Sequence, residues 1–225
     1  LLEKCLESTK KINFRISSLY PESVNDRFCE IIENPRIRPH FHLSVQSGSD
    51  KILKAMNRPY READIRRAVD NLRKVKDNPF IGCDIITGFP GETEEDFEYL
   101  LDWLRRARLD RVGCFTYSEV EGAQANYLPN PVPESVKQER YQRFMEVAQT
   151  ISEEKLQEKV GKTLTVLVDE IDVEENIAIC RSYADAPEID GHVYVDNIDE
   201  RVKVGQFLTV TIDEASEYDL FASLE

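Results

Sequence analysis

The sequence predicts an α/β protein in which parallel βα units are followed by a small all-β module. Up to about residue 159, short apolar runs with β character alternate with longer segments whose apolar residues recur every three or four positions. After Gly161 the pattern changes to short strands only, which suggests a small barrel of the OB type. We therefore predict two domains, residues 1–159 and residues 160–225.

The first part contains four predicted strands. They are residues 12–18, 41–46, 80–87 and 112–117. The run 80–87 is almost continuously apolar, as expected for a strand that is covered on both faces. Four parallel strands joined by crossover helices form part of a barrel or an open sheet. The module after Gly161 contains five predicted strands: 163–168, 177–181, 192–195, 207–212 and 218–221.

Helices are predicted between these strands from apolar periodicity and capping residues. The first begins at about Glu22, and a short one follows Ser49, a plausible N-cap. A third begins at about Glu62, and Thr93 with Asp96 forms a variant of the capping box at the start of a fourth. A long helix over residues 134–159 precedes the β module. This alternation of helix and strand is what βα units require.

Composition places the chain among soluble globular proteins. Forty-three acidic residues against 29 basic ones give a net charge of −14, and 41% of the residues are hydrophobic, which excludes disordered and collagen-like classes. No apolar run approaches the ~18 residues that would span a bilayer. The five cysteines have no close spacing, which is typical of buried thiols in a reducing compartment, so we expect a cytoplasmic protein.

The negative charge is concentrated in the β module. Residues 160–225 contain sixteen acidic and four basic residues, a net charge of −12, whereas residues 1–159 carry −2. A barrel that bound RNA would need a basic groove to neutralise phosphates, so nucleic acid is an unfavourable partner. The acidic loop 184–191 favours a basic protein surface instead, such as that of a ribosomal protein, although a loop that only aids solubility would have the same charge.

Polar and glycine residues that follow the predicted strands are the candidates for a ligand site, because ligands of parallel βα folds bind at the carboxyl ends of the strands. These candidates are Ser17, Ser18, Gln46, Ser47, Gly48, Gly88 to Glu92, Tyr117 and Ser118, with Arg58 within reach. Each one alone also has a purely structural explanation, as a turn former or a surface charge.

The turn at Gly88–Gly91 is a poor phosphate-binding loop. No lysine follows it, and acidic residues occupy the start of the next helix. A ligand with a cationic centre would meet no such repulsion, and Glu92 could serve it. The three histidines do not suggest a catalytic triad, and the five cysteines are too far apart in sequence to suggest a metal site in this chain.

Three segments carry a family resemblance. They are HLSVQSGS at 42–49, ILKAMNR at 52–58 and ITGFPGET at 86–93. They resemble the methylthiotransferases of the radical S-adenosylmethionine superfamily. Residues 109–115, 117–123 and 181–191 are similar to the branch that modifies a ribosomal protein. Together these runs span most of the chain.

The resemblance implies the last four strands of a partial (β/α) barrel of the radical SAM type, followed by a TRAM domain, which is an OB-like barrel. It implies that a methylthio group is added to the β-carbon of an aspartate in a small-subunit ribosomal protein. It also implies S-adenosylmethionine and two 4Fe-4S clusters as cofactors. The C-x3-C-x2-C cluster loop is not in this sequence. We therefore expect a carboxy-terminal fragment that is inactive alone.

The resemblance also implies roles for residues at matching positions. Contacts to the amino-acid or ribose part of S-adenosylmethionine are expected from Arg15, Ser17, Gln46 and Arg58, with close backbone approach at Gly88 and Gly91. On the substrate side, the expected residues are Tyr117 and Glu121.

Two alternatives have the same barrel. A tRNA adenosine methylthiotransferase would share the architecture, but its TRAM domain should be basic. A non-catalytic docking module would use the barrel only to support the acidic domain. The sequence upstream of Leu1 would separate the enzymes from the docking module.

Overall fold

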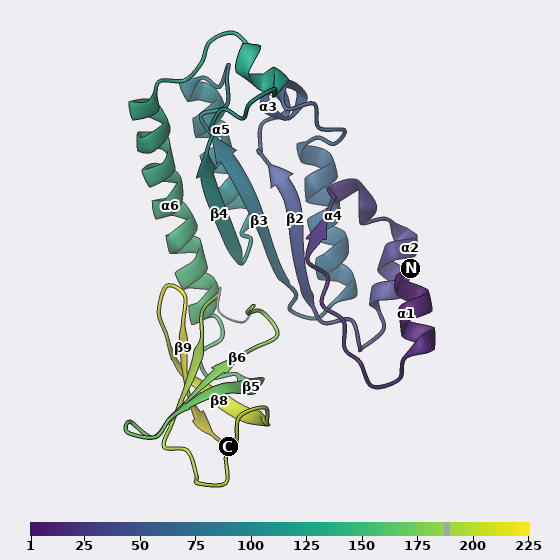
Figure 1. Cartoon of the computed structure of the whole chain (residues 1–225), viewed down its shortest axis with the longest axis vertical. Coiled ribbons are helices and arrows are strands. Elements are labelled where there is room, and N and C mark those ends of the chain that lie inside the picture. The colour runs from purple at the N-terminus through teal and green to yellow at the C-terminus, as the bar shows by residue number, and fades with distance from the viewer. Residues whose placement is uncertain (187–189) are drawn as a thin grey trace. The chain divides into compact units, whose positions relative to one another are not determined.

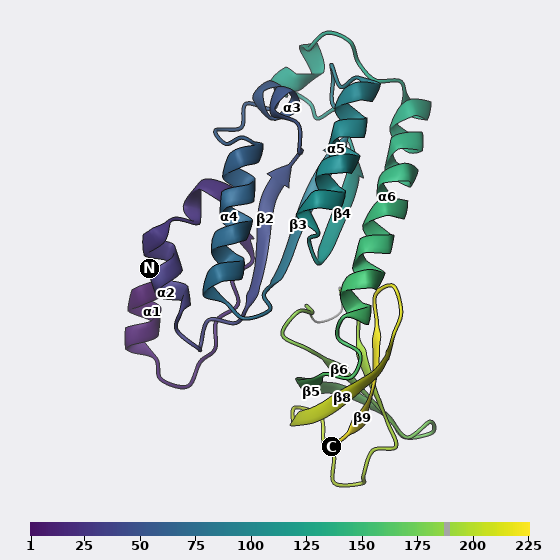
Figure 2. The ribbon, with the colours of Figure 1, turned by 180° about the vertical axis from the view of Figure 1, so that it is seen from behind.

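A computed structural model describes residues 1–186 and 190–225, which form two compact units, Leu1–Ala148 and Gln149–Glu225 (Figure 1; Figure 2 gives the view from behind). Helix α6 (Glu134–Gln157) contributes to both units. The domain boundary expected near residue 160 stays a prediction.

The first unit is a parallel four-stranded sheet with the order β1-β2-β3-β4. Its strands are β1 (Ser18–Leu19), β2 (His40–Gln46), β3 (Phe80–Thr87) and β4 (Arg111–Thr116). Because spatial order follows chain order and every pairing is parallel, the carboxyl ends of the strands meet at one edge. The expected partial (β/α) barrel is confirmed.

Two long helices cover one face of this sheet (Figures 1 and 2). They are α4 (Glu62–Val75) and α5 (Glu94–Ala107), and each turns an apolar stripe inwards, with Ile65 and Phe97 fully buried. The capping box predicted for α5 is confirmed, since Thr93 and Asp96 bond each other's backbone N–H groups. The remaining helices are α1 (Leu2–Ser8), α2 (Asp26–Ile32) and α3 (Asp50–Ala55), with the 3-10 turns η1 (Pro21–Ser23) and η2 (Gln124–Tyr127).

The first predicted strand, residues 12–18, was wrong. The segment runs beside residues 36–38, where Phe14 N–H donates to Arg36 O (2.7 Å) and Arg38 N–H donates to Phe14 O (2.8 Å). These bonds form one isolated parallel bridge, between Phe14 and Ile37. Residues 36–38 lie before the start of β2 at His40 and are not part of a strand, so the pairing does not extend further. Regular pairing starts only at Ser18, opposite His42.

Local capping moved one predicted helix start, and the predicted cap of a second helix makes no side-chain bond. Asn25 accepts from Phe28 N–H, so α2 begins at Asp26, and Pro21–Ser23 forms a separate 3-10 turn instead of the first helical residues. Ser49 occupies the N-cap position of α3, but its side chain makes no capping bond.

The second unit is a closed barrel with the strand order β5-β6-β7-β9-β8. Its strands are β5 (Thr163–Asp172), β6 (Ile177–Arg181), β7 (Val193–Asp196), β8 (Phe207–Ala215) and β9 (Leu220–Leu224). The expected small OB-like barrel is confirmed. β5 and β8 extend beyond their predicted ends at residues 168 and 212. Each contains a β-bulge just after that residue, and the strand continues to pair with its neighbour beyond the bulge.

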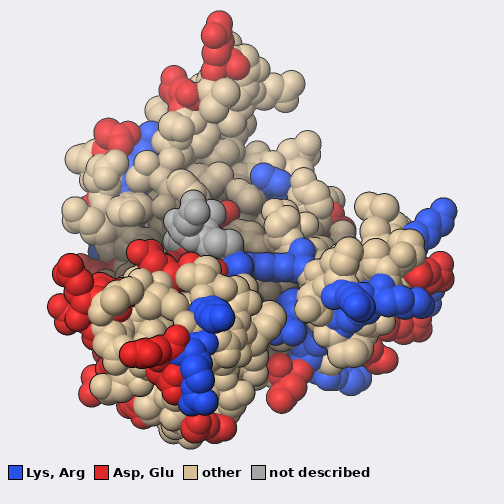
Figure 3. Space-filling model, turned by 60° about the horizontal axis from the view of Figure 1, so that its bottom comes forward, with Lys and Arg blue, Asp and Glu red and all other residues tan. Residues whose placement is uncertain are grey.

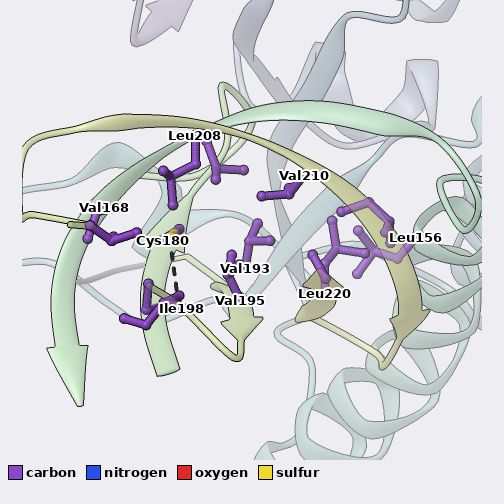
Figure 4. Packing of buried hydrophobic residues seen from close by; sticks show 14 residues of the cluster. Leu156, Val168, Cys180, Val193, Val195, Ile198, Leu208, Val210 and Leu220 are labelled. Atoms are coloured by element: carbon purple, nitrogen blue, oxygen red, sulfur yellow. Dashed lines mark hydrogen bonds between the residues drawn. The ribbon is translucent and has the colours of Figure 1, made fainter. Parts of the chain in front are cut away.

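Inward-facing side chains fill the barrel, including Val168, Cys180, Val193 and Val210, together with Leu156 from α6 (Figure 4). Part of the acidic loop 184–191 lies outside the described residues, at 187–189. In the described part of the chain, no helix is long and apolar enough to cross a membrane.

Candidate functional site: a pocket at the carboxyl edge of the sheet

A pocket of about 500 Å³ lies where β3 and β4 end. Its walls are the strand ends, the residues that follow α3 and the η2 segment, and most of its lining is apolar: Ala55, Met56, Asn57, Arg58, Ile86, Phe89, Phe115, Thr116, Tyr117, Ser118, Val120, Gln124, Ala125 and Leu128. Small-molecule sites typically have volumes of about 300–1,000 Å³ and an apolar lining with a few polar groups. Size, place in the fold and lining therefore fit an organic ligand.

Arg58 supplies the cationic group of this lining. Its backbone is fixed, since its N–H donates to Leu53 O (2.9 Å) and its carbonyl accepts from Arg61 Nη1 (2.8 Å). Its side-chain Nε is buried, and no hydrogen-bond partner for it exists among the described residues. A buried donor without a partner costs free energy unless a ligand satisfies it. Arg58 therefore has a buried donor that a hydrogen-bond acceptor on a ligand could satisfy.

Tyr117 lies at the end of β4 and lines the same pocket. Its N–H donates to Thr87 O (2.8 Å), and its hydroxyl donates to Asn126 Oδ1 (2.7 Å), which ties η2 to the sheet. Its ring meets Phe89 edge-on, with centroids 5.2 Å apart. The structure thus brings Arg58 and Tyr117 to one pocket, as expected from their positions after α3 and β4.

Gly88 and Gly91 each contact another part of this chain, and the backbone approach to a cofactor expected of them stays a prediction. Both have positive φ, +73° and +85°. A Cβ on Gly88 would lie 2.4 Å from Cγ of Lys137 on α6. Gly91 N–H donates to Asn130 O (2.8 Å), and neither glycine is among the pocket-lining residues. The turn between them places Phe89 in the lining instead.

The role considered for Glu92, a partner for a cationic ligand, was wrong. Its side chain is 1% exposed and accepts from Arg140 Nη1 on α6 (2.8 Å) and from Gly88 N–H (2.9 Å). Burial raises the pKa of Glu92, and the Gly88 N–H and the Arg140 guanidinium oppose that rise. The charge of Glu92 is already neutralised inside the protein and holds the Gly88 turn against α6.

Lys137 and Arg140 were missed from the sequence because they lie about 48 residues from the turn that they hold. Lys137 Nζ donates to Tyr117 O (2.9 Å) and lies 5.5 Å from the centre of its ring. One signal was present: Arg140 occupies the position four residues before Phe144 and eight before Ala148, in the buried stripe of α6. A charged residue in such a stripe indicates a buried partner.

The other expected contact residues do not line this pocket. Arg15 Nη2 lies 2.8 Å from His40 Nε2, at the start of β2 and so at the amino end of the sheet. Ser17 is exposed and precedes β1 instead of following it. Gln46 ends β2 with φ +68°, and Glu121 is exposed. Their roles toward a cofactor or substrate stay predictions.

The histidines of β2 have structural partners. His40 is buried and stacks on Phe80 with ring centroids 4.6 Å apart, and His42 Nε2 lies 3.1 Å from Asp84 Oδ2. The stacking of His40 and the contact of His42 with Asp84 account for both residues without a catalytic role.

An iron–sulfur cluster does not fit the cysteines of this chain. All five are free thiols, and in residues 1–186 and 190–225 no three His, Cys, Asp or Glu side chains converge as metal ligands. Burial raises the pKa of Cys114 and Cys180 to about 12, so both thiols are protonated at neutral pH.

Comparison with known proteins agrees with this architecture. Residues 1–104 match the family model of the radical SAM superfamily, and residues 160–224 match that of the TRAM domain. The solved structure of coproporphyrinogen III oxidase from Escherichia coli, described as a radical SAM enzyme, covers 68% of this chain and 36% of its own with a TM-score of 0.55 and 19% identity. That likeness concerns the fold alone. The class is thus a radical SAM protein with a TRAM domain.

Curated relatives narrow the class. A protein of Psychrobacter sp. (strain PRwf-1) is 60% identical over 219 residues, which cover 94% of this chain and 42% of the relative. One from Acinetobacter baumannii (strain AYE) is 49% identical over 211 residues, covering 93% of this chain and 47% of the relative. Both are named ribosomal protein uS12 methylthiotransferase RimO. Over more than nine-tenths of its length the chain is thus similar to RimO proteins, and it spans less than half the length of these relatives.

Proposed function

We propose that the protein to which this chain belongs is a radical SAM methylthiotransferase that adds a methylthio group to the β-carbon of an aspartate in ribosomal protein uS12. The single observation that carries this proposal is the 60% identity to a RimO protein, which extends through both the barrel and the TRAM domain. The tRNA-modifying alternative and the docking-module alternative lack that support.

The pocket at the carboxyl edge is the proposed site for S-adenosylmethionine. Arg58 offers a buried Nε to an anionic group, and Phe89, Phe115 and Tyr117 provide apolar surface that keeps water from the ligand. We propose that the bound cofactor and one 4Fe-4S cluster supply the radical and that a second cluster presents the sulfur. We propose that the cluster ligands lie in the parts of the relatives that this chain does not span.

The barrel unit is the proposed docking element for basic uS12 in the cytoplasm. Residues 160–225 carry a net charge of −12. Two of their four basic residues are already in ion pairs, Arg181 with Asp169 (2.9 Å) and Arg201 with Asp199 (2.5 Å). Figure 3 shows carboxylates on the visible face of this unit beside a few cations. Such a surface attracts a cationic protein and repels phosphates.

The decisive experiment uses the full-length protein, reconstituted with iron and sulfide and supplied with S-adenosylmethionine, a reductant and recombinant uS12. We expect one added methylthio group on an aspartate-containing peptide by mass spectrometry. Modification of tRNA adenosine and not of uS12 would overturn the proposal in favour of the nucleic-acid alternative. No product on either substrate would favour the docking module.

The pocket is tested separately with Arg58→Ala in the full-length protein. Loss of a charge-assisted hydrogen bond of about 1.5–3 kcal/mol should weaken S-adenosylmethionine binding by roughly 10- to 100-fold in calorimetry. The control is Lys54→Ala, an exposed lysine of α3. Unchanged binding in Arg58→Ala would contradict the assignment of the pocket.

A further inference from the structure

The outer surface of the barrel carries a continuous row of apolar side chains. Pairing places Ile179 of β6 opposite Tyr194 of β7, and Tyr194 opposite Phe221 of β9. The residues on either side of each, such as Ala178, Cys180, Val193 and Val195, point into the core (Figure 4). Alternation along a strand therefore puts these three side chains, which we call the aromatic row, on the outer face. Because side chains fill the interior of the barrel, a partner can bind this unit only on its outer face.

The aromatic row presents ring surface to solvent. The rings of Tyr194 and Phe221 are stacked with centroids 5.5 Å apart and an interplanar angle of 21°. The ring centroid of His192, the residue directly before β7, lies 5.8 Å from that of Tyr194. Phe221 is 37% exposed, and Ile179 and Tyr194 are half-buried. A neighbouring group can thus lie against this surface without any change in the barrel.

Carboxylates flank the aromatic row at both ends. Glu170 of β5 pairs with Ile179, and Glu214 of β8 pairs with Phe221, each directly after a bulge. Both glutamates are exposed. The next residue of β7 on the same face as Tyr194 is Asp196, which is exposed as well. Negative charge therefore borders the ring surface on several sides.

The cation beside the row is neutralised. Arg181 follows Ile179 by two positions on β6, and its Nε lies 2.9 Å from Asp169. On the other side, Asp219, directly before β9, lies near His192, with 3.9 Å between Oδ1 and Nδ1. The surroundings of the aromatic row thus remain net negative.

We propose that the aromatic row and its flanking glutamates, Glu170 and Glu214, form a docking site for a Lys- or Arg-rich segment of a protein. This inference rests on the proposed function and specifies where its partner docks. Cationic side chains bind the faces of aromatic rings and pair with nearby carboxylates. Single-stranded RNA also stacks on aromatic residues of OB barrels, but it needs cations along its backbone, and here the row is bordered by carboxylates.

The test measures binding of this 225-residue chain to recombinant uS12 by fluorescence anisotropy, with Phe221→Ala as the main variant. We expect at least a fivefold loss of affinity, the size of a typical cation–π contribution. The matched control is Phe207→Ala, which removes a ring that is 62% exposed on β8 outside the row and should bind as the unmodified chain does. Circular dichroism checks that both variants keep the barrel.

A second variant, Glu214→Lys, reverses charge at one end of the row without removing a ring. It should weaken binding and flatten its dependence on salt, whereas Glu200→Lys, at an exposed turn residue, should do so less. Wild-type affinity in Phe221→Ala, equal losses in Phe207→Ala, or no binding of uS12 by the chain would each overturn the site. Tighter binding of a uridine 20-mer that Phe221→Ala abolishes would overturn it in favour of RNA.

The experiments distinguish a failure of the docking site from a failure of the proposed methylthiotransferase function. If the full-length protein modifies uS12 while the Phe221→Ala variant of this chain binds as before, the docking site is wrong and the function stands. If the chain binds uS12 through the aromatic row and the full-length protein transfers no methylthio group, the function fails and the site stands.

Discussion

Arg140→Met tests whether a buried ion pair fixes the turn beside the pocket. Arg140 and Glu92 are 5% and 1% exposed, and their charged atoms are 2.8 Å apart. Removal of the arginine leaves a buried carboxylate with only the Gly88 N–H as a partner, a change that typically costs about 3–5 kcal/mol. Since domains are stable by only about 5–15 kcal/mol, the loss is large.

Arg143→Met is the control from the same helix. Arg143 is 31% exposed, and it pairs with Glu94 and Glu98, which are both more than half exposed. Pairs of that kind contribute about 0–1 kcal/mol. Both arginines also lie over the Phe97 ring, at 5.5 and 4.9 Å, so the two variants lose a similar aromatic contact. The difference in the free energy of unfolding between the two variants therefore measures the cost of leaving the buried Glu92 carboxylate without its arginine.

The assay is urea unfolding followed by tryptophan fluorescence. The chain has one tryptophan, Trp103, which is buried in α5, so the signal reports on the first unit alone. A cost below about 1 kcal/mol for Arg140→Met, or one equal to that of Arg143→Met, would refute the reasoning.

The pH dependence gives a second check with a defined sign. Without Arg140, the pKa of Glu92 is raised further, because burial is then opposed only by the Gly88 N–H. A group whose folded pKa lies above its unfolded value loses stability as pH rises through the folded pKa. Arg140→Met should therefore be more destabilised at pH 8 than at pH 5. Adding Glu92→Gln should recover part of the loss, and it should remove this pH dependence.

Two further predictions concern the Gly88 turn and the barrel unit. Gly88→Ala should cost about 1–3 kcal/mol more than Gly122→Ala in the same unfolding assay, because both glycines have positive φ but only the first would clash with Lys137; equal costs would contradict the close approach. Arg201 lowers the pKa of Asp199 to about 2, so its stabilising effect should be present above pH ~4 and be lost as pH falls toward 2. Arg201→Ala should raise the pKa of Asp199, followed by NMR, only part of the way to its ordinary value, because the backbone N–H of residue 201 still donates to the carboxylate; an unchanged titration would contradict the side-chain pair.

Features encoded locally were predictable from the sequence. The apolar run of β3 and the Thr93–Asp96 capping box depend on residues within a few positions of each other, and both are confirmed. Position after a strand or helix also sufficed to bring Tyr117 and Arg58 to the pocket.

Features that depend on distant partners were not predictable. The segment around Phe14 has the composition of a strand, but residues 36–38 determine how it pairs. Glu92 looked available for a ligand because Arg140, which neutralises it, lies 48 residues further along the chain. The local sequence around Gly88 also could not indicate that Lys137 of α6 packs against this glycine.

Strand β9 is the element on which closure of the barrel depends. Leu220–Leu224 pairs in parallel with β7 and antiparallel with β8, so it joins the two strands that would otherwise be sheet edges. A chain stopped at Asp219 would leave both edges open to strands of other molecules, a common origin of aggregation. During synthesis, the barrel therefore cannot close until β9 has been added as far as residue 224. Until then the edges of β7 and β8 are unpaired, and the valine-rich core between the strands is not fully enclosed.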